Sequence, residues 1–190
     1  MVKYGALALS LMFFISYTPA TAALTTSKTI TVTYPNALAT LGSVNPSADY
    51  PVGLIIPSIG LATTVVGVGV DNKGNMDVPS GSTQNVGWYK QGTKPGDIGS
   101  AVLDAHVFAA FKNLKYVPAG ADVYVLTAYG KTLHFRVSNI GNYKLSELTG
   151  KQLFGLNDTA RLNLITCSGS LTPDHSTYDH RLVVYATLVS

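Results

Sequence analysis

Three side chains that could carry out covalent chemistry stand at the ends of apolar segments. Cys167 is the only cysteine among the 190 residues and follows the apolar run 162–166. His106 follows the apolar run 100–103, and Arg181 opens the last apolar run. A cysteine enzyme needs a thiolate, a proton donor for the leaving group and a group that stabilises the tetrahedral intermediate, so these residues are candidates for the three roles. The alternative for Cys167 is a core position, a common fate of a free cysteine.

The elements that must position these residues are predicted to be short strands. Only 12% of the residues are charged, while Gly, Thr, Val and Tyr are plentiful, which favours a β-rich fold. We expect strands at 53–57, 62–66, 100–103, 121–127, 132–138, 162–167 and 181–189. Residues 108–116 read as a short helix or turn, residues 139–158 as a long connection with a short helix at 145–148, and residues 168–180 as a polar loop. The sequence therefore predicts a mainly β fold, an antiparallel-rich barrel or sandwich of about eight strands with short helices.

The N-terminal residues resemble a secretory signal. Lys3 precedes the apolar run 4–17, and small residues at 19–23 fit cleavage after Ala22. We expect residues 1–22 to be a signal peptide or a membrane anchor, residues 23–50 a linker or arm, and residues 51–190 the globular domain. Either reading places the domain outside the cytoplasm, secreted or anchored to the membrane.

Composition and motifs exclude several classes of partner. The net charge of +3 comes without a run of Lys and Arg, so nucleic acid is not an expected partner. One cysteine cannot form an internal disulfide. The chain has no HExxH, CxxC or Gly-rich phosphate loop, and we expect neither a metal nor another cofactor.

Six short segments carry a more specific signal. They are 54–60 (LIIPSIG), 86–89 (VGWY), 95–99 (PGDIG), 101–106 (AVLDAH), 164–167 (LITC) and 181–184 (RLVV). In this order, behind a secretory N-terminus, they resemble the sortases, cysteine transpeptidases of the outer face of Gram-positive-type cell envelopes. The resemblance runs from about residue 51 to residue 189. Ala105 departs from the glycine that usually precedes the histidine, and the short 168–180 loop suits the compact class F-like or class E-like sortases.

The resemblance implies a closed β-barrel enzyme that cleaves an LPxTG-like sorting signal. In such an enzyme Cys167 would form a thioacyl intermediate, His106 would protonate the leaving amine, and Arg181 would hydrogen-bond the substrate carbonyl or the oxyanion. An amine acceptor, a peptidoglycan cross-bridge or a pilin lysine, would resolve the intermediate. Thr166 is a further candidate for shaping the substrate groove, and residues 139–158 are expected to set specificity.

Other residues and functions stay open at this point. The alternation of side chains along a strand predicts that His134 faces solvent and that His180 has a rim or structural role. Asp104 would be able to orient His106 only if the strand continues as far as these residues. An L,D-transpeptidase would show Ser-His-Gly-Cys, whereas Ile165 and Thr166 precede the cysteine here. The alternative from another class is a non-catalytic extracellular β-domain, either a degenerate sortase or an adhesin-like binding module.

Overall fold

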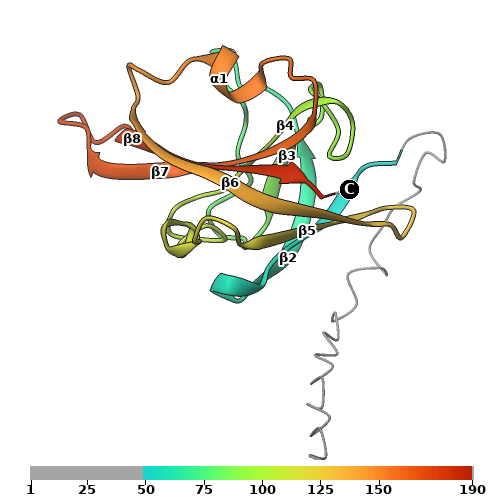
Figure 1. The fold of residues 1–190 in the computed structure, drawn as a ribbon. Coiled ribbons are helices and arrows are strands. Elements are labelled where there is room, and N and C mark those ends of the chain that lie inside the picture. Colours follow the sequence, from blue (N-terminus) through green and yellow to red (C-terminus); the bar gives the residue numbers. More distant parts are fainter. Residues whose placement is uncertain (1–48, 190) are drawn as a thin grey trace, which may run out of the picture. The chain divides into compact units, whose positions relative to one another are not determined.

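The strands form a closed β-barrel (Figure 1). Apolar side chains alternate along these strands and are buried in the barrel interior. The computed structural model describes residues 49–189, so the expected signal segment 1–22 and nearly all of the 23–50 arm lie outside the described residues. The strands are β1 (Pro51–Ile56), β2 (Leu61–Val68), β3 (Val86–Tyr89), β4 (Gly99–Asp104), β5 (Asp122–Thr127), β6 (Thr132–Lys144), β7 (Ala160–Leu171) and β8 (Tyr178–Leu188). They follow one another around the barrel as β1-β2-β3-β4-β7-β8-β6-β5. The mainly β, closed eight-strand fold expected from the sequence is confirmed.

The barrel interior holds the main hydrophobic core. Its largest fully buried side chains include Leu54, Leu103, Val125, Phe135 and Leu164. The connection from β4 to β5 adds Phe111 and Leu114 to this core, and the latter begins the 3-10 helix η3 (Leu114–Tyr116). A second 3-10 helix, η2 (Pro57–Ile59), joins β1 to β2. Each fully buried side chain of this kind contributes about 1.5–3 kcal/mol, so the core fixes the strand registers.

Two strand pairings matter most for the residues singled out above. β4 and β7 are parallel, with Asp104 opposite Ile165, so their carboxyl ends reach the same edge of the sheet. β7 and β8 are antiparallel, with Cys167 opposite Arg181. The segments that end in His106 and Cys167 are far apart in sequence, and the parallel pairing is what places them side by side.

A smaller apolar cluster lies on the outer face of these same strands. It consists of Val102, Ile165 and Val183 from β4, β7 and β8, together with Leu153 of helix α1 (Gly150–Phe154). Met76, Tyr143, Leu148 and Tyr185 pack against it. We call this group the outer apolar cluster. It shows that the outer face near the candidate residues is covered rather than open to water.

Three expectations about element boundaries were wrong. β6 continues to Lys144 because residues 139–144 pair with β8, so this stretch is strand and not connection. The helix lies at Gly150–Phe154 instead of 145–148, since Thr149 and Gln152 form a capping box at its start. β7 runs past Cys167 to Leu171, because Gly169 takes a left-handed conformation (φ 79°) and forms an irregularity within the strand instead of ending it.

No helix in the described part of the chain, residues 49–189, is both long enough and apolar enough to cross a membrane.

Candidate active site

Cys167 and Arg181 lie opposite each other on the outer face of the barrel. On β7, Leu164 and Thr166 are buried on the inner side, so Cys167 points outward by alternation. On β8, Leu182 and Val184 belong to the inner core, and Arg181 likewise points outward. Both side chains are half-buried. The thiol and the guanidinium group are therefore neighbours across one antiparallel strand pair.

His106 follows the end of β4 at the same edge of the sheet. The Ala105 amide donates to the carbonyl of Ile165 at 3.4 Å, so the β4–β7 pairing continues beyond Asp104. Asp104 is opposite Ile165, so His106 and Cys167 each lie two residues beyond this pair. The imidazole is half-buried and stacks on Phe108, with ring centroids 4.8 Å apart. The parallel pairing of β4 with β7 thus places His106 on the same side of the barrel as Cys167 and Arg181.

Thr166 joins the two strands just before the histidine and the cysteine. Its side chain is only 1% exposed, and its hydroxyl donates to the Ala105 carbonyl at 2.7 Å. Ala105 itself is 1% exposed and packs in the barrel core, so the core accommodates its methyl group where a glycine is usual. Thr166 therefore holds the end of β4 against β7, and its contact with substrate stays a prediction.

The guanidinium group of Arg181 is held by the turn between β7 and β8. Nη1 donates to the carbonyls of Tyr178 and His180, both at 2.9 Å, and Nη2 donates to Thr177 Oγ1 at 2.9 Å. Within residues 49–189 no group accepts a hydrogen bond from Nε. The turn thus fixes one edge of the guanidinium and leaves the Nε–H group for another acceptor.

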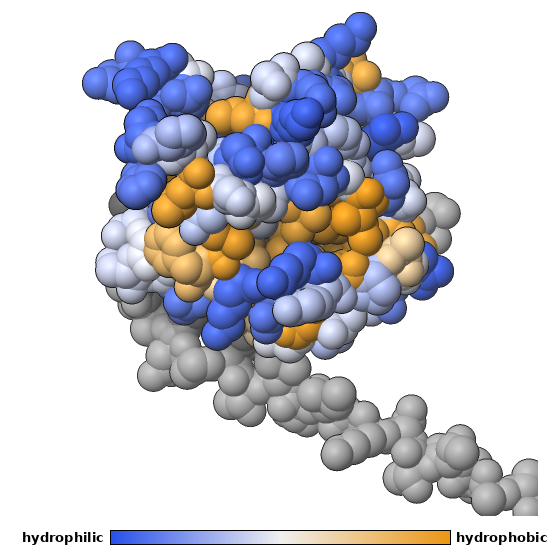
Figure 2. Space-filling model, turned by 90° about the vertical axis from the view of Figure 1, so that its left-hand side faces the viewer, coloured by the Kyte–Doolittle hydropathy of each residue, from blue (hydrophilic) through white to orange (hydrophobic). Residues whose placement is uncertain are grey.

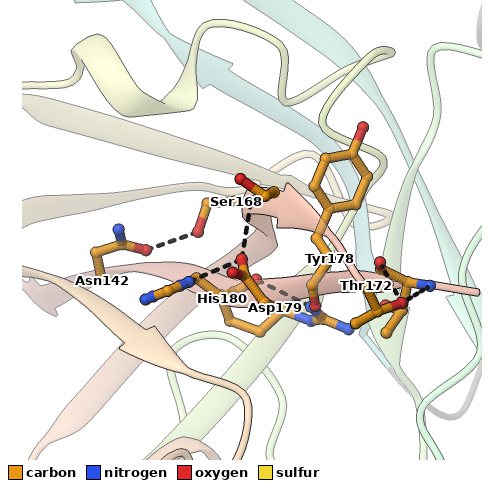
Figure 3. A network of polar contacts seen from close by, with 9 residues as sticks. Asn142, Ser168, Thr172, Tyr178, Asp179 and His180 are labelled. Atoms are coloured by element: carbon orange, nitrogen blue, oxygen red, sulfur yellow. Dashed lines mark hydrogen bonds and ion pairs between the residues drawn. The ribbon is translucent and has the colours of Figure 1, made fainter. Parts of the chain in front are cut away.

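A network of polar side chains stabilises this end of the β7–β8 hairpin (Figure 3). Asp179 Oδ1 accepts from the Ser170 amide and pairs with His180 Nδ1, both at 2.8 Å. Ser168 Oγ donates to Asn142 Oδ1 at 2.6 Å, which ties β7 to β6. His180 therefore lies in the rim of the hairpin and not in the site, in line with its predicted structural role. Sequence reasoning missed the carbonyls that hold Arg181, because backbone acceptors leave no trace in residue types.

Burial and neighbouring charges set the protonation of the site. Burial raises the pKa of the Cys167 thiol above its ordinary value; the charge of Arg181 opposes this effect and that of Asp104 adds to it. Burial also raises the pKa of Asp104 to about 7, although Arg181 again acts in the opposite direction. At neutral pH the thiol is therefore protonated, and it needs a base to become a nucleophile.

The stretch predicted to set specificity contributes to the surroundings of the site. Leu153 belongs to the outer apolar cluster, and Asn163 Nδ2 on β7 donates to its carbonyl at 2.7 Å, which anchors α1 to the sheet. Phe154 packs edge-to-face against Tyr89 of β3. Leu156 is 98% exposed beside them. The role of residues 139–158 in specificity stays a prediction, now with β6 forming its first part.

Apolar surface gathers on the side of the molecule where β7 and β8 meet their turn. Figure 2 shows this side, with apolar residues in a band across the middle and polar residues above and below it. Exposed apolar residues around the site include Phe108 after β4, Leu145 after β6 and Leu171 at the end of β7. A band of this kind is suited to contact with a peptide that carries apolar side chains.

Comparison with known proteins identifies the family. The chain is similar to sortase C1 of Streptococcus agalactiae, with 23% identity, a TM-score of 0.56, and coverage of 73% of this chain and 66% of that chain. It is also similar to sortase C1 of Streptococcus suis, with 21% identity, a TM-score of 0.57, and coverage of 74% of this chain and 73% of that chain. A third similar structure is sortase A of Corynebacterium diphtheriae, with 21% identity, a TM-score of 0.56, and coverage of 74% of this chain and 61% of that chain. These likenesses show the fold. No curated protein sequence matches the chain. The sortase-domain family model matches residues 54–189, and the chain therefore belongs to the sortase family.

Proposed function

We propose that this chain is a cysteine transpeptidase that cleaves an LPxTG-like sorting signal and transfers it to an amine of the cell envelope. The observation that carries the proposal is the meeting of residues from three neighbouring strands. Cys167 and Arg181 face each other across β7 and β8, and the parallel strand β4 delivers His106 to the same edge. A nucleophile, a proton carrier and a cation at one site are what acyl transfer through a thioester requires.

The first half-reaction forms a thioacyl-enzyme. His106 acts as the base that takes the proton of the half-buried Cys167 thiol, and Sγ attacks the threonine carbonyl of the sorting signal. Collapse of the tetrahedral intermediate breaks the peptide C–N bond, and the imidazolium returns its proton to the leaving glycine amine. The acyl group stays on Sγ as a thioester.

The second half-reaction releases the acyl group to an acceptor. An amine attacks the thioester carbonyl, His106 takes the proton of that amine, and the C–S bond breaks. The acceptor is a peptidoglycan cross-bridge or a pilin lysine. In both halves the Nε–H group of Arg181 is suited to donate to the carbonyl oxygen as negative charge develops there, because the β7–β8 turn already orients the guanidinium.

The proposal also includes where the enzyme works. An N-terminal signal peptide or anchor in residues 1–22 would place the domain outside the cytoplasm, secreted or held at the membrane. The class F-like or class E-like assignment is likewise part of the proposal.

Cleavage of a panel of sorting-signal peptides by the purified full chain tests this function. We expect one peptide to be cut between Thr and Gly, with a thioacyl adduct at Cys167 visible by mass spectrometry. Cys167→Ala should abolish both cleavage and adduct. Ser168→Ala is the matched control, since it changes the next residue and removes only the hydrogen bond to Asn142.

The outcomes separate the proposal from its alternatives. An unreactive thiol and no cleavage across the panel would favour a non-catalytic binding domain, such as a degenerate sortase or an adhesin-like module. Cleavage that survives Cys167→Ala would contradict the role of the cysteine.

A further inference from the structure

Asp104 is a half-buried carboxyl group close to the proposed nucleophile, and the reaction steps above do not use it. It is the last residue of β4 and lies on the outer face, since Leu103 and Ala105 on either side belong to the inner core. Its partner on β7 is Ile165, two residues before Cys167, and its partner on β3 is Gly87. The carboxyl group therefore lies on the same face as the thiol and Arg181.

Residues 76–81, in the connection between β2 and β3, cover this part of the sheet. Met76 packs on the outer apolar cluster. Pro79 lies over Gly87, where an added Cβ would be 2.8 Å from Pro79 Cδ. Gly81 lies against Phe108 and His106, where an added Cβ would meet the two rings at 2.9 and 3.4 Å. The segment thus follows the outer face of β4 from the cluster to the histidine.

The charged and titratable groups around Asp104 come from every neighbouring element. β7 contributes Cys167, β8 contributes Arg181, and His106 follows on its own strand. Tyr89 of β3 lies further along and packs on Phe154. The covering segment contributes Asp77, which is exposed and accepts a hydrogen bond from the Val78 amide. Arg181 is therefore the cation whose charge acts on both Asp104 and Cys167.

No ion pair in the described residues 49–189 joins Asp104 to Arg181. The guanidinium is instead held by Tyr178, His180 and Thr177. The Asp104 carboxyl group and the Cys167 thiol both become negative when they lose a proton. The positive charge of Arg181 acts on both, and in the described part of the chain Asp104 forms no ion pair with it. In such a cluster, charge on one acid disfavours charge on the other.

We propose that Asp104 is a positioning residue that tunes the ionisation of Cys167: an ionised Asp104 carboxylate disfavours the thiolate, and a neutral side chain at this position favours it beside Arg181. The inference rests on the proposed role of Cys167 as the nucleophile. It makes Asp104 act on the reaction through charge and not through contact with substrate. Burial raises the pKa of Asp104 to about 7, so its charge changes in the pH range where the enzyme would work.

Alkylation of Cys167 tests the proposal directly. The chain has one cysteine, so the rate of reaction of the full chain with iodoacetamide reports on one thiol. We would measure this rate from pH 5 to pH 10 for the parent and for Asp104→Asn. The neutral amide should move the rise in rate to lower pH and increase the rate at pH 8 about threefold or more, because a lower thiol pKa gives a larger thiolate fraction at that pH.

Three further variants make the result decisive. Asp104→Glu restores the charge and should return the profile toward that of the parent. Asp104→Ser gives the same test with a smaller neutral residue if the amide variant does not fold. Asp122→Asn, which removes an aspartate on β5 whose side chain is 41% exposed, should leave the profile unchanged. Neutral variants whose profiles superimpose on that of the parent, or move to higher pH, would overturn the proposal.

The test is independent of peptide cleavage. If alkylation depends on Asp104 while no peptide is cleaved, the charge coupling stands and the proposed function fails. If peptides are cleaved while alkylation ignores Asp104, the function stands and the role of Asp104 is wrong.

Discussion

Two clusters on the barrel are built from the same three residue types, an aspartate, a histidine and an arginine. On β5 and β6, Asp122 Oδ1 lies 2.8 Å from His134 Nε2 and 3.1 Å from Arg136 Nη2. His134 stacks on Tyr124 with ring centroids 4.8 Å apart. At the candidate active site, His106 stacks on Phe108 at the same centroid separation of 4.8 Å. Residue types and ring stacking therefore do not distinguish the two clusters.

Burial and pairing do distinguish them. The Asp122 side chain is 41% exposed, and hydrogen bonds from His134 and Arg136 lower its pKa. Asp104 is half-buried, and burial raises its pKa to about 7. The first cluster is a solvated ion pair of the kind that contributes little to stability and has no thiol beside it. In the second cluster no ion pair joins Asp104 to Arg181 within residues 49–189. Arg181 lies opposite Cys167 instead.

The largest difference is expected between the two histidines. His106→Gln should lower the rate of peptide cleavage by about 10²–10⁴-fold, because it removes the proposed general acid and base. His134→Gln should leave the rate within about twofold, as is usual for a substitution at a solvated position. Steady-state cleavage of the same peptide by both variants measures the difference. Equal losses would mean that neither histidine transfers the proton.

The two arginines should differ almost as much. Arg181→Gln should reduce kcat by about 10²–10³-fold, the usual effect of losing a group that stabilises the oxyanion. Arg136→Gln is the matched control and should reduce it by no more than about twofold. A thermal melt of each variant shows whether the β7–β8 turn has loosened without Arg181. A loss for Arg181→Gln that appears only in KM would indicate substrate binding instead of oxyanion stabilisation.

The two aspartates should respond to pH in opposite directions. The folded-state pKa of Asp104 is raised from 3.8 to about 7, so its stabilising effect is present below pH 4 and is lost as the pH rises toward 7. Asp104→Asn should therefore raise the free energy of unfolding by up to about 4 kcal/mol at pH 8 relative to the parent, with little difference at pH 4.

The pH dependence of stability at Asp122 has the opposite sign to that at Asp104. Its pKa is lowered, so its contribution is present above the unfolded value of 3.8 and is lost as the pH falls through the folded value. Asp122→Asn should then differ from the parent near neutral pH and approach it in acid. Urea unfolding at pH 3, 4, 6 and 8 measures both variants. A gain for Asp104→Asn that is independent of pH would contradict the ionisation of this carboxyl group.

The smallest effect is expected at Thr166, which has no counterpart in the Asp122 cluster. Thr166→Val keeps the shape of the side chain but removes the hydroxyl that donates to Ala105, and should lower the free energy of unfolding by about 1–3 kcal/mol because the carbonyl loses a buried partner. Cleavage should fall by less than about tenfold if Thr166 acts only through strand pairing. A larger fall at unchanged stability would support the predicted contact with substrate.

The sequence by itself determined the class of the fold and the family. Alternating apolar runs separated by Gly and Pro turns predicted a mainly β chain of about eight strands, and six ordered segments from residue 54 to residue 184 carried the resemblance to sortases; both predictions are confirmed. The local pattern was sufficient because strand periodicity and turn residues act within a few neighbours. The roles of Cys167, His106 and Arg181 stay predictions that the geometry supports.

Only the tertiary structure decided the boundaries and the electrostatics. Both β6 and β7 extend beyond their predicted ends because they pair with β8. The added part of β6 pairs with residues 36 to 46 positions away, as at Asn139 with Tyr185, and the added part of β7 pairs across the hairpin, as at Ser168 with His180. Asp104 ends β4 and Asp122 begins β5. Their opposite pKa directions follow from the burial of Asp104 and from the hydrogen bonds that Asp122 accepts from His134 and Arg136. Burial depends on segments distant in sequence, so no reading of the local pattern could have separated the two.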